Sequence, residues 1–132
     1  MNNVQHVSLH AMLDSYSAYI TQRSAASPAS AAKRTNVIRR LKEAHKDLPI
    51  NAFGHGDILS MVDHWRSRPA AKTSGKPIAR TTAAKHISEL RNFLAWLHEN
   101  PEASWSMPSN FRRLNTQPVR LDSDFRSKGQ PS

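Results

Sequence analysis

The longest regular pattern of apolar and polar positions covers residues 80–99. Apolar side chains recur there at steps of three and four, as on one face of a helix that needs a core. These apolar residues are Ile87, Leu90, Phe93, Leu94 and Leu97. Half a turn away the same segment carries short polar or basic side chains, namely Thr81, Lys85, Ser88 and Asn92. The pattern therefore predicts a long helix that buries one face and leaves the opposite face free.

Three earlier segments, 9–23, 31–46 and 58–68, show the same helical period. Each follows or begins at a residue suited to capping a helix, and these residues are Ser8, Ser30 and Asp57. Their apolar stripes predict the rest of the core: Leu9, Met12, Leu13, Tyr16, Ile20, Val37, Leu41, Ala44, Ile58, Met61, Val62 and Trp65. A shorter helix is expected at 109–114, and no segment of useful length alternates like a strand. The sequence predicts an all-α, single-domain bundle of four main helices plus a short C-terminal helix.

The domain boundaries follow from the polar segments at the two ends. Residues 1–7 precede the first helical pattern and are expected to be flexible. Residues 8–114 hold all the helical patterns, so we expect one helical domain there. Residues 115–132 are polar and poor in apolar side chains, which is typical of a linker or disordered tail.

Charge changes the picture from a plain bundle to a binding module. The 132 residues include 19 Lys and Arg against 10 Asp and Glu, a formal net charge of +9. Such a balance favours a polyanionic partner, with nucleic acid first and an acidic membrane surface second. The chain has no cysteine, which excludes disulfides and thiol chemistry and fits a reducing cytoplasm. No signal peptide or membrane-spanning run is present, so we expect a cytoplasmic protein.

The residue types that carry catalysis are scattered. His6 and His10 are four positions apart, yet no ligand-type side chain with metal spacing accompanies them. The acids do not pair as in hydrolases, no serine sits in a nucleophile-elbow motif, and the four glycines do not form a phosphate-binding loop. We therefore expect no catalytic residue, no metal, no cofactor and no small-molecule substrate.

Basic residues, by contrast, gather on particular helix faces and loops. The 31–46 helix has polar and basic residues opposite its apolar stripe, as the 80–99 helix does. Two helices that pack by their apolar stripes can present such faces side by side to a duplex, where a helix fits the major groove and peripheral cations hold phosphates. The candidates from this charge pattern are Thr35, Arg39, Lys42 and Lys46 on one helix, Arg80, Thr81 and Lys85 on the other, and Lys33 and Lys76 nearby.

The order and spacing of these helices resemble the N-terminal, SAM-like core-binding domain of tyrosine recombinases, the phage integrase family. The resemblance covers residues 9–114, and its last long helix carries the family-like series Thr82, Ile87, Leu90, Arg91, Phe93 and Leu94, followed by Trp96. A segment resembling the family's short fifth helix runs from Phe111 to Leu114. No single motif is diagnostic, and the register of the five elements together carries the resemblance.

In that family the domain clamps one side of duplex DNA during DNA integration and recombination, with its second and fourth helices in the major groove. By position, the resemblance assigns groove-facing places to Lys33, Thr35, Asn36 and Arg39, and to Thr81, Lys85 and His86. It implies double-stranded DNA as the partner, other recombinase protomers assembled on that DNA, and a prokaryotic, nucleoid-associated location. For His86 the alternative is a boundary residue that touches no DNA, and for Lys42 and Lys46 the alternative is a solvated helix end.

The chain departs from the family in one respect. The family's catalytic Arg, Lys, His, second Arg and nucleophilic Tyr belong to a further domain, and the residues after 114 contain no Tyr. We therefore expect DNA binding without strand cleavage, from either a fragment of a longer integrase or a stand-alone relic. The second class of function that stays open is a helical protein-interaction or adaptor module whose basic charge is incidental.

Overall fold

The computed structural model describes residues 7–24, 26–109, 114–121 and 124, and this part of the chain is all-helical. It contains α1 (Leu9–Arg23), α2 (Pro28–Ala44), the short 3-10 helix η1 (Ile50–Ala52), α3 (His55–Arg66) and α4 (Arg80–His98). The described residues form no strand, and their only β-type pairings are isolated bridges at Ser8–Pro49 and Ala70–Pro77. The predicted all-α class is confirmed. The short helix predicted at 109–114 falls mostly outside the described residues.

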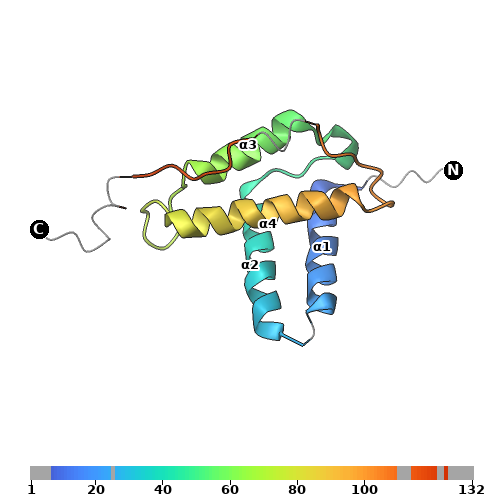
Figure 1. Ribbon diagram of the computed structural model, residues 1–132, viewed down its shortest axis with the longest axis horizontal. Coiled ribbons are helices and arrows are strands. Elements are labelled where there is room, and N and C mark those ends of the chain that lie inside the picture. Colours follow the sequence, from blue (N-terminus) through green and yellow to red (C-terminus); the bar gives the residue numbers. More distant parts are fainter. Residues whose placement is uncertain (1–6, 25, 110–113, 122–123, 125–132) are drawn as a thin grey trace, which may run out of the picture.

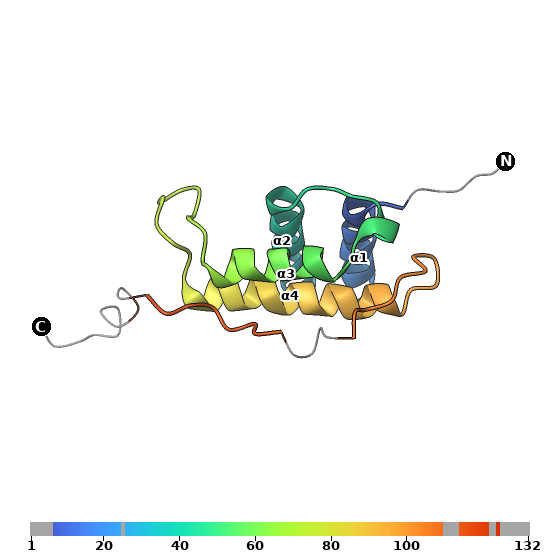
Figure 2. The same cartoon turned by 90° about the horizontal axis from the view of Figure 1, so that it is seen from above.

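The four helices form two pairs that cross one another. α1 and α2 make an antiparallel hairpin that runs crosswise to α4, and α3 lies antiparallel beside α4 (Figure 1). Seen from above, the α1–α2 hairpin packs on one side of the α3–α4 pair (Figure 2). The apolar stripes predicted for α1, α3 and α4 are all buried where these helices meet. The periodic pattern therefore identified three of the four core-facing surfaces.

The N-terminal end of α1 is held by the segment that follows α2. The Ser8 hydroxyl accepts a hydrogen bond from the Ala11 N–H at 3.1 Å, as predicted for a cap. The Asp47 carboxylate accepts from the His10 N–H at 2.8 Å, and the Leu48 carbonyl accepts from the Leu9 N–H at 2.8 Å. These bonds satisfy N–H groups that a helix start leaves open, so they close the α1–α2 hairpin at its base.

α2 begins earlier than predicted and is rotated about its axis. It starts at Pro28, because proline already has the backbone angle of a first helical turn and needs no N–H there. The predicted cap, Ser30, is thus wrong: it lies inside the helix, and its hydroxyl accepts a hydrogen bond from Ser27. The buried face consists of Ala31, Ile38 and Leu41, whereas Ala44 is exposed, because α2 packs against both α1 and α4.

α3 also begins before its predicted start and ends before its predicted end. Asp57 acts as predicted at the N-terminal end, but from the third helical position, where its carboxylate accepts from the Gly54 N–H at 2.9 Å. The helix ends at Arg66 because Arg68 adopts a left-handed conformation with φ of 61°. The following loop, 69–79, is fastened by the Ala71 N–H to Lys76 carbonyl bond at 2.8 Å and by the Ala70–Pro77 bridge.

The chain returns along α3 after α4. Trp105 is buried and donates from its ring N–H to the Phe53 carbonyl at 2.8 Å. Further on, the Val119 N–H donates to the Arg66 carbonyl at 2.9 Å, and the Arg68 guanidinium bonds Asp124. The described part of the predicted linker, 115–121 with 124, therefore lies against the α3–α4 pair, toward the N-terminal end of α4 (Figure 2).

Candidate nucleic-acid interface

The predicted residues of α2 lie mainly on its outer surface. Lys33, Asn36 and Arg39 are exposed, and Thr35 is half-buried beside them on a shallow hollow shared with α1. The Arg39 guanidinium donates to the Asn36 side-chain oxygen and, at 2.9 Å, to the Glu43 carboxylate. The Arg39 side chain nevertheless remains 56% exposed, so its charge is available to a partner.

The predicted residues at the start of α4 are exposed on the side that faces α2. Thr81 and Lys85 are both exposed. One turn beyond Lys85, the Glu89 carboxylate is bonded to Arg34 of α2 at 2.8 Å. Because residues four apart share a helix face, Lys85 lies on the part of α4 that is turned toward α2.

Between these two helices lies a cleft of about 700 Å³, which we call the basic cleft. Its walls are the C-terminal half of α2, the end of α3, loop 69–79 and the first turns of α4. The charged and polar side chains that line it include Arg39, Arg40, Glu43, His64, Lys72, Thr82 and His86. From α4 the cleft is lined by Thr82 and His86, whereas the predicted Thr81 and Lys85 do not line it.

Glu43 is the only acid that lines the basic cleft among the described residues. It accepts from Arg39 at 2.9 Å and from Lys72 at 3.4 Å, and these two cations lower the pKa of its carboxyl group, with the Arg39 hydrogen bond the larger cause. Lys72 is 87% exposed, so this pair is a loose one. Arg40 is exposed and makes no hydrogen bond or ion pair with another described residue. The cleft therefore presents net positive charge.

Two predicted site residues, Lys42 and Arg80, are directed elsewhere, and a third, His86, lines the basic cleft but is buried. Lys42 points to α1 and pairs with Asp14 at 2.9 Å. Arg80 donates to the Pro118 carbonyl at 3.3 Å and lies near Gln117, so its guanidinium is turned to the returning segment. His86 is buried, with 2% of its surface exposed. Of the remaining two, Lys46 is exposed beyond the end of α2 and Lys76 is exposed on loop 69–79.

His86 of α4 packs against Trp65 of α3. Its ring stacks on Trp65 with ring centres 4.3 Å apart, and its Nδ1 lies 2.8 Å from the Thr82 carbonyl oxygen. A carbonyl oxygen only accepts, so Nδ1 carries the proton in the neutral ring. The other nitrogen, Nε2, is buried and has no hydrogen-bond partner among the described residues. Burial and the nearby charges of Arg40 and His64 lower the pKa of His86.

Sequence patterns missed the polar network that fixes the crossing of α2 and α4. Glu89 is buried and accepts from Arg34 through both oxygens at 2.8 Å and from the Tyr16 hydroxyl at 2.7 Å. The available signal was the position of Glu89 itself, since it lies four residues before the buried Phe93 on the same helix. Arg40 and His64 were also absent from the predicted site, although Arg40 is adjacent in sequence to the predicted Arg39.

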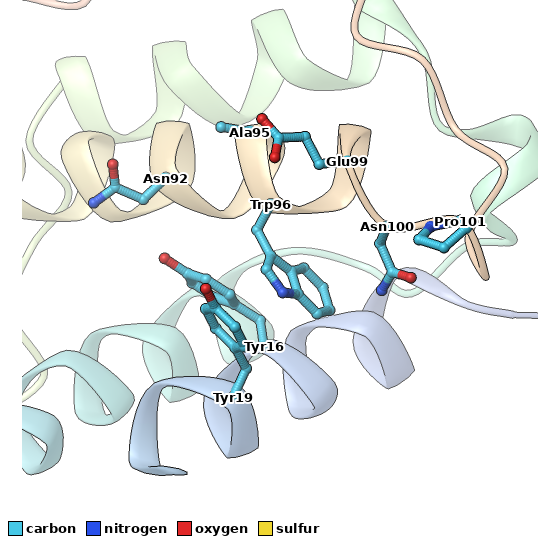
Figure 3. A pocket seen from close by; sticks show the side chains of 8 residues that line it. All are labelled: Tyr16, Tyr19, Asn92, Ala95, Trp96, Glu99, Asn100 and Pro101. Atoms are coloured by element: carbon cyan, nitrogen blue, oxygen red, sulfur yellow. The ribbon is translucent and has the colours of Figure 1, made fainter. Parts of the chain in front are cut away.

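Tyr16, Tyr19 and Trp96 gather in the corner between α1 and α4 (Figure 3). The hollow there measures about 520 Å³, and Glu99, Asn92 and Asn100 stand at its rim. Tyr16 is buried, as predicted, whereas Tyr19 is 38% exposed and Trp96 is half-buried. No Lys or Arg is among the described residues that line this hollow, so it differs in character from the basic cleft.

The described residues contain neither a metal-binding cluster nor a membrane-spanning helix. No group of three His, Asp or Glu side chains could hold a metal ion among them. None of their helices has both the length and the apolar character needed to cross a bilayer. Comparison of the chain with protein-family models, curated proteins and solved structures finds no match.

Proposed function

We propose that this chain is a duplex-DNA-binding module of the tyrosine recombinase type. In this proposal α2 and α4 enter the major groove and clamp one side of a recombination site, together with other recombinase protomers on the same DNA. The module would act at the nucleoid of a prokaryotic cell. The proposal assigns DNA binding to these residues and assigns no strand cleavage to them.

One observation carries the proposal: α2 and the first turns of α4 share a concave, positively charged surface. Arg39 and Arg40 come from α2, Lys72 comes from the loop, and a single acid lines the same cleft among the described residues. The exposed Lys33 and Lys85 add charge on the two helices. Cations spread over two crossed helices suit the phosphates on both sides of a groove.

The decisive experiment is a titration of fluorescent duplex DNA at several salt concentrations. About six phosphate contacts would give a slope of log K against log salt near −5. A duplex enriched from a random pool serves as the specific site, and an unselected duplex serves as the non-specific one. An affinity that hardly changes with salt would argue against a phosphate-dominated interface.

Two lysine variants separate base reading from charge. Lys85→Ala should cost about 1–3 kcal/mol on the enriched duplex and much less on the unselected one, if Lys85 contacts base edges. Lys46→Ala is the matched control, because it lies beyond α2 and should weaken both duplexes equally. Equal losses on both duplexes for Lys85→Ala would show that α4 does not read bases.

The aromatic corner of Figure 3 favours the second candidate, a protein-interaction module. Exposed Tyr19 and half-buried Trp96 are side-chain types enriched in protein interfaces. Tyr19→Ala should leave DNA affinity unchanged under the main proposal, since the corner lies outside the basic cleft. Salt-insensitive DNA binding by the unmodified chain would favour this second candidate.

A further inference from the structure

The basic cleft contains three features that its role as a flank of a DNA interface does not require. Arg40 stands in its wall without a hydrogen bond or ion pair to another described residue. His86 also lines the cleft, and its buried Nε2 lacks a partner among the described residues. Loop 69–79 forms a wall that its own backbone bonds hold in place. A buried polar atom without a hydrogen-bond partner costs stability. A bound group that is not part of the described chain would supply the partner of His86 Nε2.

We infer that the basic cleft binds a phosphate group, with Arg40 as its main cation and His86 as a hydrogen-bond donor from Nε2. Arg39 and Lys72 reach the same cleft and add charge. Arginine suits this task because its planar guanidinium can bind two phosphate oxygens at once. The group could come from the DNA backbone or from a free phosphate compound, because both carry the same oxygens.

Binding of this kind is coupled to a proton. Nδ1 of His86 already donates to the Thr82 carbonyl, so Nε2 can donate only when the ring is protonated and positively charged. Burial and the charges of Arg40 and His64 oppose that protonation. A bound phosphate neutralises Arg40 and accepts from Nε2, and both effects favour the protonated ring.

Four elements supply the charged and titratable side chains near His86: α2, α3, loop 69–79 and α4. Arg40, Arg39 and Glu43 face it from α2, His64 from α3 and Lys72 from loop 69–79. On α4 itself, Lys85 is adjacent in sequence and Glu89 is already engaged with Arg34. Lys72 and Arg39 are partly neutralised by Glu43, whereas Arg40 is not paired with a described residue. Arg40 is thus the cation through which an anion acts most strongly on this ring.

The test uses the whole chain and inorganic sulfate as the first probe, since sulfate has the shape of phosphate and does not titrate near neutral pH. We expect saturable changes in the NMR signals of the Arg40 guanidinium and the His86 ring. One linked proton should tighten sulfate binding by up to about tenfold for each unit of pH decrease. Binding that is absent, does not saturate or is independent of pH would overturn the inference.

Variants locate the site. Arg40→Gln should weaken sulfate binding at least tenfold, and because Arg40 is exposed the fold should persist. Arg91→Gln is the matched control, since Arg91 is exposed on α4 and does not line the cleft. His86→Asn should abolish the pH dependence of sulfate binding. If this variant does not fold, the comparison of Arg40→Gln with Arg91→Gln and the NMR signals of the unmodified chain still test the inference. Equal weakening by Arg40→Gln and Arg91→Gln would contradict a built site.

Two further probes distinguish the sources of phosphate. If the DNA backbone supplies the group, a thymidine dinucleotide should bind and Arg40→Gln should weaken duplex binding. If a free phosphate compound is the ligand, inorganic phosphate should bind and duplex affinity should be the same for both variants. Sulfate binding alone tests this inference, so it can fail while DNA binding stands, and the reverse also holds.

Discussion

At the scale of single residues, Glu89 is the most informative side chain in the core. Its carboxylate is 6% exposed and is satisfied by Arg34 and the Tyr16 hydroxyl, which come from two other helices. Burial, followed by the Glu89 hydrogen bond, raises the pKa of Tyr16, and the same carboxylate raises the pKa of Arg34. The network therefore keeps Tyr16 and Arg34 protonated, and it ties α1, α2 and α4 together.

Removing the carboxylate should be costly. Glu89→Ala leaves Arg34 and the Tyr16 hydroxyl without their partner, and we expect a loss of about 2–4 kcal/mol, reduced from the fully buried case because Arg34 is 41% exposed. Tyr16→Phe removes the donor to Glu89 and the acceptor of an Arg34 N–H at 2.9 Å, and it should cost about 1.5–3 kcal/mol. Urea denaturation measures both. Glu43→Ala is the control from an exposed pair, and a Glu89→Ala loss no larger than the control's would refute this view of the network.

His45 predicts how stability depends on pH. Its Nε2 accepts from the Trp65 ring N–H at 2.9 Å, and burial with the charges of His64 and His10 lowers its pKa to about 4. In the unfolded chain His45 has an ordinary histidine pKa of about 6.5. Between about pH 4 and pH 6.5 the unfolded chain therefore binds more protons than the folded chain. Stability should therefore fall as the pH drops from about 6.5 to about 4, and His64 and His86, whose pKa values are also lowered, add in the same direction.

The check is chemical denaturation at several pH values in that window. His45→Asn keeps an acceptor for Trp65 that does not titrate, so it should reduce the slope without removing it. A slope identical to that of the unmodified chain would show that His45 is not the group that titrates.

Local patterns account for most residues of the core and few residues of the polar network. Leu90, Phe93 and Leu94 were identified because burial of a helix face follows directly from a period of three to four. The burial of Glu89 depends on Arg34, which is 55 positions away in the chain, so no local pattern contains it. His86 was placed on the DNA-facing surface by resemblance, whereas its burial follows from stacking on Trp65.

At the scale of elements, both ends of each of the four main helices lie within three residues of their predicted positions. The start of α2 differs from the prediction: Pro28, a residue found both in connectors and at helix starts, is already the first helical residue. Proline is compatible with either role, and only the position of the preceding turn decides between them. Loop 69–79 is fastened by three backbone hydrogen bonds, two of which form the Ala70–Pro77 bridge.

Two glycines provide a matched test of loop 69–79. Gly75 has φ of 71°, and a Cβ there would meet no atom within 4 Å, so Gly75→Ala should destabilise by about 1 kcal/mol through backbone conformation alone. Gly56 lies in the first turn of α3 and is equally free of contacts. Gly56→Ala should therefore stabilise by about 0.5–1 kcal/mol. Thermal unfolding compares the two, and equal shifts of the same sign would contradict the left-handed geometry of Gly75.

At the scale of the whole molecule, the basic cleft could not be derived from sequence. It depends on the crossing of α2 over α4 and on a wall supplied by loop 69–79. The charge pattern nevertheless named Arg39, because the polar face of an amphipathic helix is predictable, whereas Thr81 and Lys85 do not line the cleft. What it lacked was the long-range contact that decides which exposed faces meet.

The returning segment should also affect the kinetics of unfolding. Arg68 bonds the Val119 carbonyl at 3.0 Å and Asp124 at 2.8 Å, across 51 and 56 positions of the chain. Contacts so distant in sequence tend to form late, whereas the α1–α2 hairpin closes over a short connector. Asp124→Asn should thus speed unfolding severalfold and leave the refolding rate unchanged, as measured by stopped-flow mixing. Refolding that slows by the same factor would place this contact in the folding nucleus.

The segment that returns along α3 also has a consequence for folding during synthesis. A ribosome releases α1 and α2 first and α3 and α4 next, and residues 114–124 follow only after all four helices. Until residues 114–124 are released, the Arg66 carbonyl lacks its hydrogen bond from the Val119 N–H. The Arg68 guanidinium, which is buried in the folded chain, likewise lacks the Asp124 carboxylate. A nascent chain halted before residue 114 should hence hold its helices loosely and remain open to proteases, and it tightens only when its last segment is released.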